Sequence, residues 1–139
     1  MLPANRLYFQ LRRTRTRIRT PRKPHMSILL RLRHEGSIAI AGVRGSLTLS
    51  PTLRGFKKQI ERSFTDATRG LVLDLAEVPE MDSAGIGELV ALYSSAKRRG
   101  FEVALVGAND RVTALLRLTR LDAFFQLHQD QAAAIAALK

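Results

Sequence analysis

The segment Asp82–Gly85 holds the residues of this sequence with the clearest potential for chemistry. It follows an apolar run, Leu71–Leu75, which is typical of a buried strand, and it opens a stretch with helical periodicity. A hydroxyl at a strand-to-helix junction lies where free backbone N–H groups and the helix dipole favour negative charge. The sequence therefore predicts that Ser83 is a phosphorylation site.

A simpler interpretation is that Asp82 or Ser83 only caps the helix, which is worth ~1 kcal/mol. That interpretation leaves Gly85 and Gly87 unexplained, since glycine in a helix costs up to about 1 kcal/mol relative to alanine. We expect that another surface approaches this backbone closely. A phosphate on Ser83 would add roughly −1.5 to −2 charges beside Asp82. Such a change would switch binding while the fold stays intact.

The patterns of known catalytic sites are missing from the sequence. There is no phosphate-binding loop of the G-x-x-x-x-G-K-[ST] type and no G-x-G-x-x-G. Met81 stands where a G-x-S-x-G nucleophile motif around Ser83 would need glycine. The three histidines, His25, His34 and His128, show no metal-ligand spacing. We therefore predict no catalytic residue, no cofactor and no metal.

The composition fits a single globular domain. The chain has 139 residues, of which 45% are apolar. It contains no cysteine, which fits a reducing compartment, and we expect a cytoplasmic protein. No apolar run approaches the ~18 residues typical of a membrane-spanning helix, so we expect no membrane insertion.

The positive charge is concentrated at the beginning of the chain. The net charge is +11, but residues 1–25 hold eight basic residues and no acid, which leaves +3 for residues 26–139. We expect residues 1–25 to be disordered, because like charges repel and few apolar side chains are present. They are either a basic arm for nucleic acid or an anionic membrane, or a segment foreign to the native protein, which would then start at Met26. The nearly balanced charge of residues 26–139 does not indicate nucleic-acid binding by the folded domain.

Hydrophobic periodicity predicts the element order β-β-α-β-α-β-α-β-α. The first two strands form an antiparallel hairpin around a turn of about four residues. Alternation of strands and helices after the hairpin implies a parallel sheet. The predicted fold class is α/β, with a mostly parallel central sheet, an N-terminal antiparallel hairpin and about four helices. The strands are expected at 28–33, 38–44, 71–75, 101–106 and 124–127, and the helices at 51–67, 84–99, 110–119 and 131–138.

Two of the helices have a predicted buried side. The helix after Ser83 carries apolar residues at i, i+3, i+4 and i+7. The last helix, capped by Asp130, is rich in alanine. The residues expected to be buried are Ile86, Leu89, Val90 and Tyr93 in the first of these helices, and Ala133, Ile135, Ala136 and Leu138 in the second.

Nearly all of residues 26–139 resembles the STAS domain, in particular the bacterial anti-sigma factor antagonists. Leu71–Val78 followed by Met81–Gly87 resembles the strand, loop and phosphorylation motif of that family. Gly100–Gly107 resembles its next strand, while Leu116–Leu121 and Phe124-Phe125 resemble its late helix and strand. The four residues Asp-Ser-Ala-Gly alone would be a weak match, but the combination is specific.

The resemblance implies a partner-switching function. An antagonist of this family binds an anti-sigma factor, commonly a serine protein kinase, and so frees a sigma factor for transcription. The kinase phosphorylates the serine, here Ser83, which ends the binding, and a separate serine phosphatase restores it. The domain itself catalyses nothing. The partner-binding residues that the resemblance implies are Ser46, Thr48, Asp82, Ala84, Gly85, Ile86 and Gly87.

One departure from the family pattern concerns the partner. The family often has Gly-Glu-Leu-Asp after its second strand, where this chain has hydroxyl residues in place of both acids, at Ser46 and Thr48. In the family these acids lie beside the phosphorylation loop and contribute to partner contact. A diverged partner or a response-regulator output therefore stays open. Two further alternatives are a STAS subunit of a lipid or anion transport system, and a nucleic-acid binder that uses residues 1–25.

Overall fold

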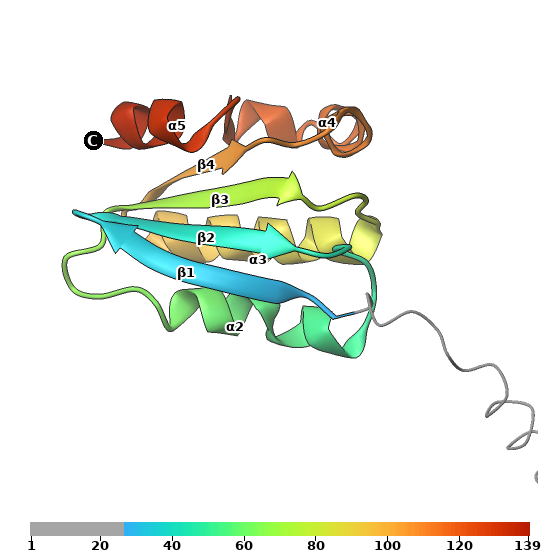
Figure 1. Ribbon diagram of the computed structural model, residues 1–139, viewed down its shortest axis with the longest axis horizontal. Helices are drawn as coiled ribbons and strands as arrows, with labels where there is room; N and C mark the ends of the chain where they lie inside the picture. Colours follow the sequence, from blue (N-terminus) through green and yellow to red (C-terminus); the bar gives the residue numbers. More distant parts are fainter. Residues whose placement is uncertain (1–26) are drawn as a thin grey trace, which may run out of the picture.

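A five-stranded sheet forms the centre of the molecule, in the strand order β1-β2-β3-β4-β5 (Figure 1). The computed structural model describes residues 27–139, and the predicted basic segment 1–25 lies outside them. β1 pairs antiparallel with β2 and all other neighbours pair parallel, which confirms the predicted mixed sheet. The strands are β1 Leu29–Glu35, β2 Ile38–Arg44, β3 Gly70–Glu77, β4 Glu102–Val106 and β5 Gln126–His128.

The hairpin turn is shorter than predicted. β1 continues through Glu35, which pairs with Ile38, so only Gly36 and Ser37 form the turn. Gly36 has φ +62°, a left-handed conformation that favours glycine. The prediction of a four-residue loop was wrong because polar residues at the end of an edge strand look like a turn in the sequence.

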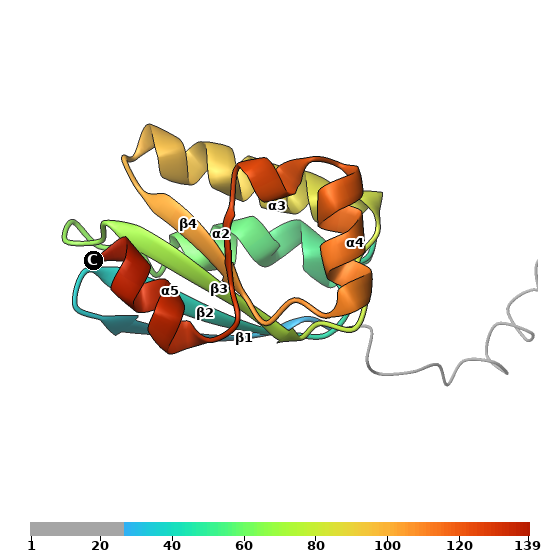
Figure 2. The same cartoon turned by 90° about the horizontal axis from the view of Figure 1, so that it is seen from above.

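Helices cover both faces of the sheet, in the predicted element order. The larger apolar cluster joins α2, α3 and α4 to one face, and the smaller joins α5 to the other. Figures 1 and 2 show α2 and α3 side by side along the sheet and α5 on the opposite face. The helices are α2 Phe56–Glu61, α3 Ser83–Arg98, α4 Asp110–Leu118 and α5 Gln131–Leu138, with short 3-10 helices at η2 Pro51–Gly55 and η3 Leu121–Ala123.

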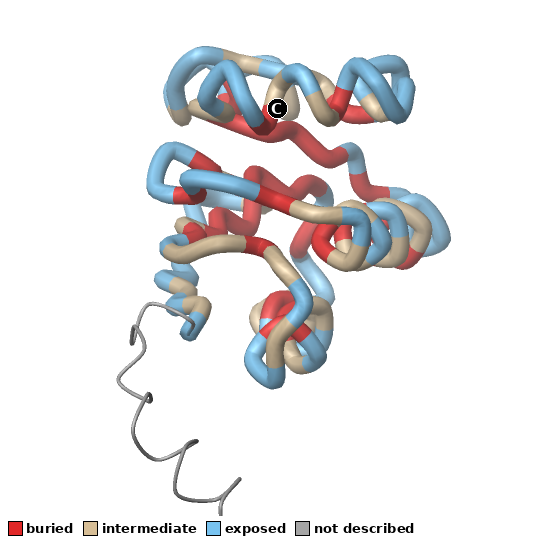
Figure 3. The backbone as a smooth tube through the Cα atoms, turned by 90° about the vertical axis from the view of Figure 1, so that its right-hand side faces the viewer, coloured by how far each residue is buried: buried red, intermediate tan, exposed pale blue. Residues whose placement is uncertain are grey.

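β3 is the buried central strand that its apolar run predicts. Leu71, Leu73 and Leu75 belong to the larger cluster, whereas Val72 belongs to the smaller one. All four side chains are fully buried. Figure 3 shows the buried segments gathered between the layers of the molecule. This strand carries the chain directly to the loop before Ser83.

α2 ends at Glu61, six residues earlier than the predicted end at Ala67. The predicted start is confirmed, because Ser50 caps the segment and Pro51 opens it as the 3-10 helix η2. After the helix, the Thr68 hydroxyl accepts a hydrogen bond from the Thr65 backbone N–H at 2.9 Å. Thr68 is buried. The turn around it stands where we had predicted the end of the helix, on the basis of the apolar Phe64.

Two predicted buried faces need correction. In α3, Leu89 is buried as expected, but Val90 is 40% exposed and Leu92 takes its place in the core. In α5, the structure buries Ala134 and Ile135 and leaves Ala133 and Ala136 exposed. A helix composed almost entirely of alanine has too little contrast to reveal which side packs inward. Within residues 27–139, no helix combines the length and the apolar character needed to cross a lipid bilayer.

Candidate functional site

Asp82 is the residue that organises the start of α3. One carboxylate oxygen accepts hydrogen bonds from the backbone N–H groups of Ala84 and Gly85, at 2.9 and 3.0 Å. The other accepts one from the Leu49 N–H at 3.0 Å. Burial alone would raise the pKa of Asp82, but these backbone donors outweigh it and lower the pKa. The ionised carboxylate therefore holds both the helix and the neighbouring loop.

Ser83 is the first residue of α3 and its side chain is exposed. The sequence left the choice of cap between Asp82 and Ser83 open, and the structure assigns it to Asp82. Because Asp82 already occupies the N–H groups of Ala84 and Gly85, the Ser83 hydroxyl is not needed to cap the helix. Its exposure leaves the hydroxyl accessible for modification or for contact with another protein.

The loop that follows β2 lies directly against the loop before Ser83, as predicted for Ser46 and Thr48. Leu47 is fully buried and forms a parallel bridge with Met81. The Leu47 N–H donates to the Glu80 carbonyl at 3.0 Å, and its carbonyl accepts from the Asp82 N–H at 3.2 Å. The two loops thus form one surface around Ser83, on which Ser46 and Thr48 are partly exposed.

The two glycines of the first helical turns have different explanations. Gly85 is buried, and a Cβ atom there would lie 2.0 Å from the Leu47 carbonyl oxygen and 2.8 Å from Met81. The close approach that we predicted is therefore made within the chain at this position. Gly87 is exposed, and a Cβ atom there would meet nothing within 4 Å. Packing among residues 27–139 does not account for Gly87, and its partner-binding role stays a prediction.

The other two predicted partner-binding residues are only partly accessible. Ala84 and Ile86 are both half-buried and pack against the larger apolar cluster. The Ile86 N–H donates to the Asp82 carbonyl at 3.0 Å, which starts the regular helical hydrogen bonding. The accessible part of the predicted site is therefore centred on Ser83 and Gly87.

Three residues that were not predicted from the sequence also shape this surface. The Asn109 amide donates to the carbonyls of Val78 and Pro79, at 3.3 and 3.1 Å. Arg111 forms an ion pair with Glu80 at 3.7 Å. Leu49 is 74% exposed beside Asp82, although it is a large apolar residue. Leu49 had a signal in the sequence, as a large apolar residue between the polar residues Thr48 and Ser50.

The histidines and the acidic residues are the side chains that could provide catalytic or metal-binding groups. His34 lies on β1, 3.5 Å from the Thr68 hydroxyl, and His128 lies on β5 beside Gln126. Neither histidine is part of the surface around Ser83. Within the described part of the chain, no group of three or more His, Cys, Asp or Glu side chains is arranged to hold a metal ion.

A scan against protein-family models matches residues 30–134 to the STAS domain. The chain belongs to the STAS domain family. STAS proteins are generally not enzymes, and the predicted STAS fold agrees with the observed mixed sheet and helices.

Two kinds of protein are among the relatives that are similar to this chain in sequence. The chain is 38% identical over 60 residues to an anti-sigma-B factor antagonist of Listeria monocytogenes, covering 42% of this chain and 53% of that protein. It is 37% identical over 59 residues to the intermembrane phospholipid transport system binding protein MlaB of Escherichia coli, covering 42% and 61%. The matched stretch thus spans about half the length of the Listeria protein.

A solved structure extends the similarity over more of the chain. The crystal structure of an anti-sigma factor antagonist from Mycobacterium paratuberculosis aligns with a TM-score of 0.70 at 22% identity. The alignment covers 84% of this chain and 97% of that structure. At 22% sequence identity, the structural similarity establishes the fold alone.

Proposed function

We propose that this STAS protein is an anti-sigma factor antagonist whose binding is switched at Ser83. In the unphosphorylated state it binds an anti-sigma factor in the cytoplasm and so regulates sigma-dependent transcription. Phosphorylation of Ser83, by the anti-sigma factor itself if it is a serine kinase, ends the binding, and a serine phosphatase restores it. The observation that carries this proposal is the exposed Ser83 hydroxyl on the first turn of α3, beside a cap that does not use it.

The geometry supports a switch that acts through charge. The carboxylate of Asp82 already accepts the N–H groups of Ala84 and Gly85, so these two donors are not available to a phosphate. The phosphate would add its charge next to the ionised carboxylate of Asp82, the preceding residue. A partner surface that fits a neutral hydroxyl would then meet uncompensated negative charge. The cap stays in place, so the fold is retained.

The partner surface also includes the loop after β2. Leu49 is a large exposed apolar residue beside Asp82, and its side chain offers apolar area that a partner can bury. Ser46 and Thr48 stand on the same loop as neutral hydroxyl residues. We infer that the partner of this chain does not require acidic groups at these two positions, which sets it apart from the partner of a standard antagonist.

The test is a binding measurement on charge variants of the full chain. A pull-down first isolates the partner, and mass spectrometry shows whether it is an anti-sigma factor. Titration calorimetry then compares Ser83→Asp with Ser94→Asp, which places the same charge on the same helix about three turns away. We expect Ser83→Asp to weaken binding at least tenfold, with an unchanged circular dichroism spectrum, and Ser94→Asp to bind like wild type. Equal affinity of Ser83→Asp and wild type would refute the switch.

A second candidate function is that of a binding subunit in a lipid transport system. The specific observation is the similarity to MlaB, which has nearly the same identity as the antagonist match and covers a larger share of the relative. Isolation of a transport-system component in the same pull-down, in place of an anti-sigma factor, would favour this candidate.

A further inference from the structure

The outward side of α2 and of the 3-10 helix before it carries three exposed basic residues. Arg54, Lys58 and Arg62 are exposed at i, i+4 and i+8, opposite the buried side chains of Phe56 and Ile60. None of these three cations has an ion-pair partner among residues 27–139. The helix dipole favours cations near a helix C-terminus but not at Arg54, which precedes α2. Like charges at i, i+4 repel one another, so the helix gains no stability from this pattern.

The C-terminal end of α3 continues the same basic surface. Arg98 and Arg99 are exposed there, and the Arg99 guanidinium lies over the ring of Phe64, 5.3 Å from its centroid. α2 and α3 cover the same side of the sheet and run side by side (Figures 1 and 2). We call this surface the basic face, and its members are Arg54, Lys58, Arg62, Arg98 and Arg99.

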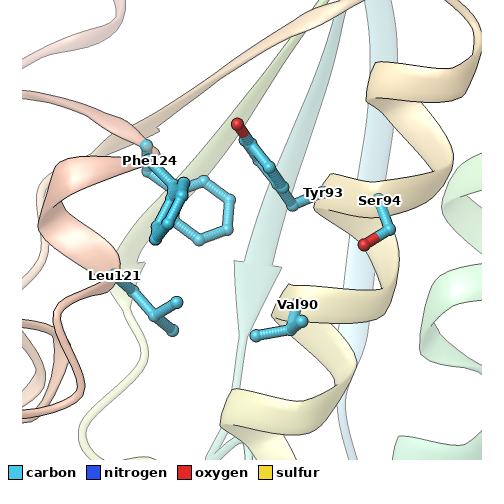
Figure 4. A pocket seen from close by; sticks show the side chains of 6 residues that line it. Val90, Tyr93, Ser94, Leu121 and Phe124 are labelled. Atoms are coloured by element: carbon cyan, nitrogen blue, oxygen red, sulfur yellow. The ribbon is translucent and has the colours of Figure 1, made fainter.

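An apolar groove borders the basic face on the far side of α3. It has a volume of about 210 Å³ and is lined by Val90, Tyr93, Ser94, Leu121, Phe124 and Phe125. Figure 4 shows Val90 and Tyr93 of α3 facing Leu121 and Phe124. Phe124 is 56% exposed, although its ring contacts Tyr93 at 5.8 Å between centroids.

Lys97 joins the groove to the basic face. Its ammonium lies 6.0 Å from the centroid of the Tyr93 ring and pairs with Glu102 at 2.9 Å. One paired cation, Lys97, thus stands between the unpaired cations at the end of α3 and the aromatic side chains of the groove. Cations next to exposed aromatic and aliphatic side chains are the pattern by which proteins lie on a membrane surface.

We propose that the basic face and the adjoining groove bind the surface of an anionic phospholipid bilayer. The cations contact the lipid phosphates, and Phe124 enters the boundary between headgroups and acyl chains. Peripheral binding of this kind needs no membrane-spanning helix. The cations at the end of α3 are separate from the proposed switch, because Arg98 lies fifteen residues, about 22 Å, along the helix from Ser83.

Nucleic acid fits this surface less well than a bilayer does. Single strands bind through exposed aromatic rings within a basic groove, whereas the exposed ring of this surface, Phe124, lies in a groove that no cation lines. Duplex DNA is read by an element that enters a groove, whereas α2 has only six residues and lies flat on the sheet. A bilayer is flat and can contact cations on two parallel helices at once.

The first test measures binding of the full chain to vesicles. The vesicles are phosphatidylcholine alone, or an equimolar mixture of phosphatidylcholine and phosphatidylglycerol. The triple variant Lys58→Glu/Arg62→Glu/Arg98→Glu is compared with a control of equal net charge, Arg31→Glu/Arg117→Glu/Lys139→Glu, whose sites are exposed elsewhere. Each cation near an anionic membrane strengthens binding about fivefold. We expect the first variant to bind the mixed vesicles at least about 100-fold more weakly than wild type, and the control less than about tenfold.

The second test places a reporter in the groove. The chain contains no tryptophan, so Phe124→Trp gives a single emission signal, and Leu118→Trp gives a matched control at an apolar residue that is 79% exposed outside the groove. Mixed vesicles should shift the emission of the first variant to the blue and leave the second unchanged. Equal weakening by both charge triples, an unshifted emission of the Phe124→Trp variant, or tighter binding to duplex DNA than to the mixed vesicles would each overturn the proposal.

Discussion

The two ends of α3 differ in charge and in how they are held. At the start, Asp82 accepts three backbone hydrogen bonds, and a second acid, Glu80, stands two residues before it. At the other end, cations predominate and exposed aromatic side chains lie beside them. A phosphate on Ser83 would make the acidic end more acidic without touching the basic end. One helix thus separates a position that responds to charge from a surface that attracts anions.

The largest loss of stability that we predict is at the acidic end, where the backbone of α3 contacts the loop after β2. Gly85→Ala places a Cβ atom 2.0 Å from the Leu47 carbonyl oxygen, which accepts the Asp82 N–H. We expect a loss of unfolding free energy on the order of 3 kcal/mol, because backbone must move. Urea denaturation measures it. Gly87→Ala is the control, and its open site should raise stability by up to about 1 kcal/mol; a similar loss at both positions would contradict the packing argument.

The second-largest loss of stability is predicted for Asp82, the N-cap residue of α3. Asp82→Ala removes an acceptor of three backbone N–H groups and should cost about 2 kcal/mol at neutral pH. Because folding lowers the pKa of Asp82, its contribution is complete above the ordinary value of 3.8 and is lost as the pH falls through the lower folded pKa. Stability measured against pH should therefore decline less in the variant than in wild type over this acidic range. Parallel curves would show that Asp82 is not the source of the acid sensitivity.

At the basic end, a polar contact holds α2 to α3. The buried Ser95 hydroxyl donates to the Glu61 carboxylate, which also pairs with Lys57 at 3.2 Å. Burial raises the pKa of Glu61, but Ser95, Lys57 and Arg99 outweigh it and lower the pKa. Ser95→Ala should cost about 1.5 kcal/mol in thermal or urea unfolding. Ser94→Ala, one residue away, is expected to change little, and equal losses would show that the contact is not specific.

The smallest effect is predicted at the switch residue itself. Ser83→Ala should change the free energy of unfolding by less than about 0.5 kcal/mol, because Asp82 provides the cap and the Ser83 side chain is exposed. Chemical denaturation checks this. A loss near 1 kcal/mol would mean that the hydroxyl shares in capping, and the distinction between cap and switch would then fail.

Four of the five strands could be predicted closely from the sequence because their signal is local. The strand predicted at 124–127 begins only at Gln126, because Phe124 ends the 3-10 helix η3. β2 was predicted to the residue, and β3 differs only at its ends, since short apolar runs bounded by turn residues are typical of buried strands. The end of α2 could not be predicted, because the turn that stops it depends on the burial of Thr68 beneath neighbouring elements. The buried side of α5 could not be predicted either, because alanine residues stand on both sides of the helix and give no hydrophobic contrast.

Local motifs placed Ser83 at a helix start, and the family resemblance implied that the loop after β2 lies beside it. The reason for Gly85 is a carbonyl group 38 residues away in sequence, at Leu47, and no local pattern reports such a contact. The support from Asn109 and Arg111 likewise comes from the start of α4. Contacts between distant segments decide these details, so they require the folded structure.

The position of Ser83 on the first turn of a formed helix restricts which enzymes can act on it. Many modifying enzymes recognise an extended stretch of substrate, but residues around Ser83 are fixed by the bridge between Leu47 and Met81 and by the Asp82 cap. An enzyme that acts on this serine must recognise the folded surface. A peptide that spans residues 78–88 would lack Leu47 and Leu49, and we expect it to be a poor substrate compared with the intact protein.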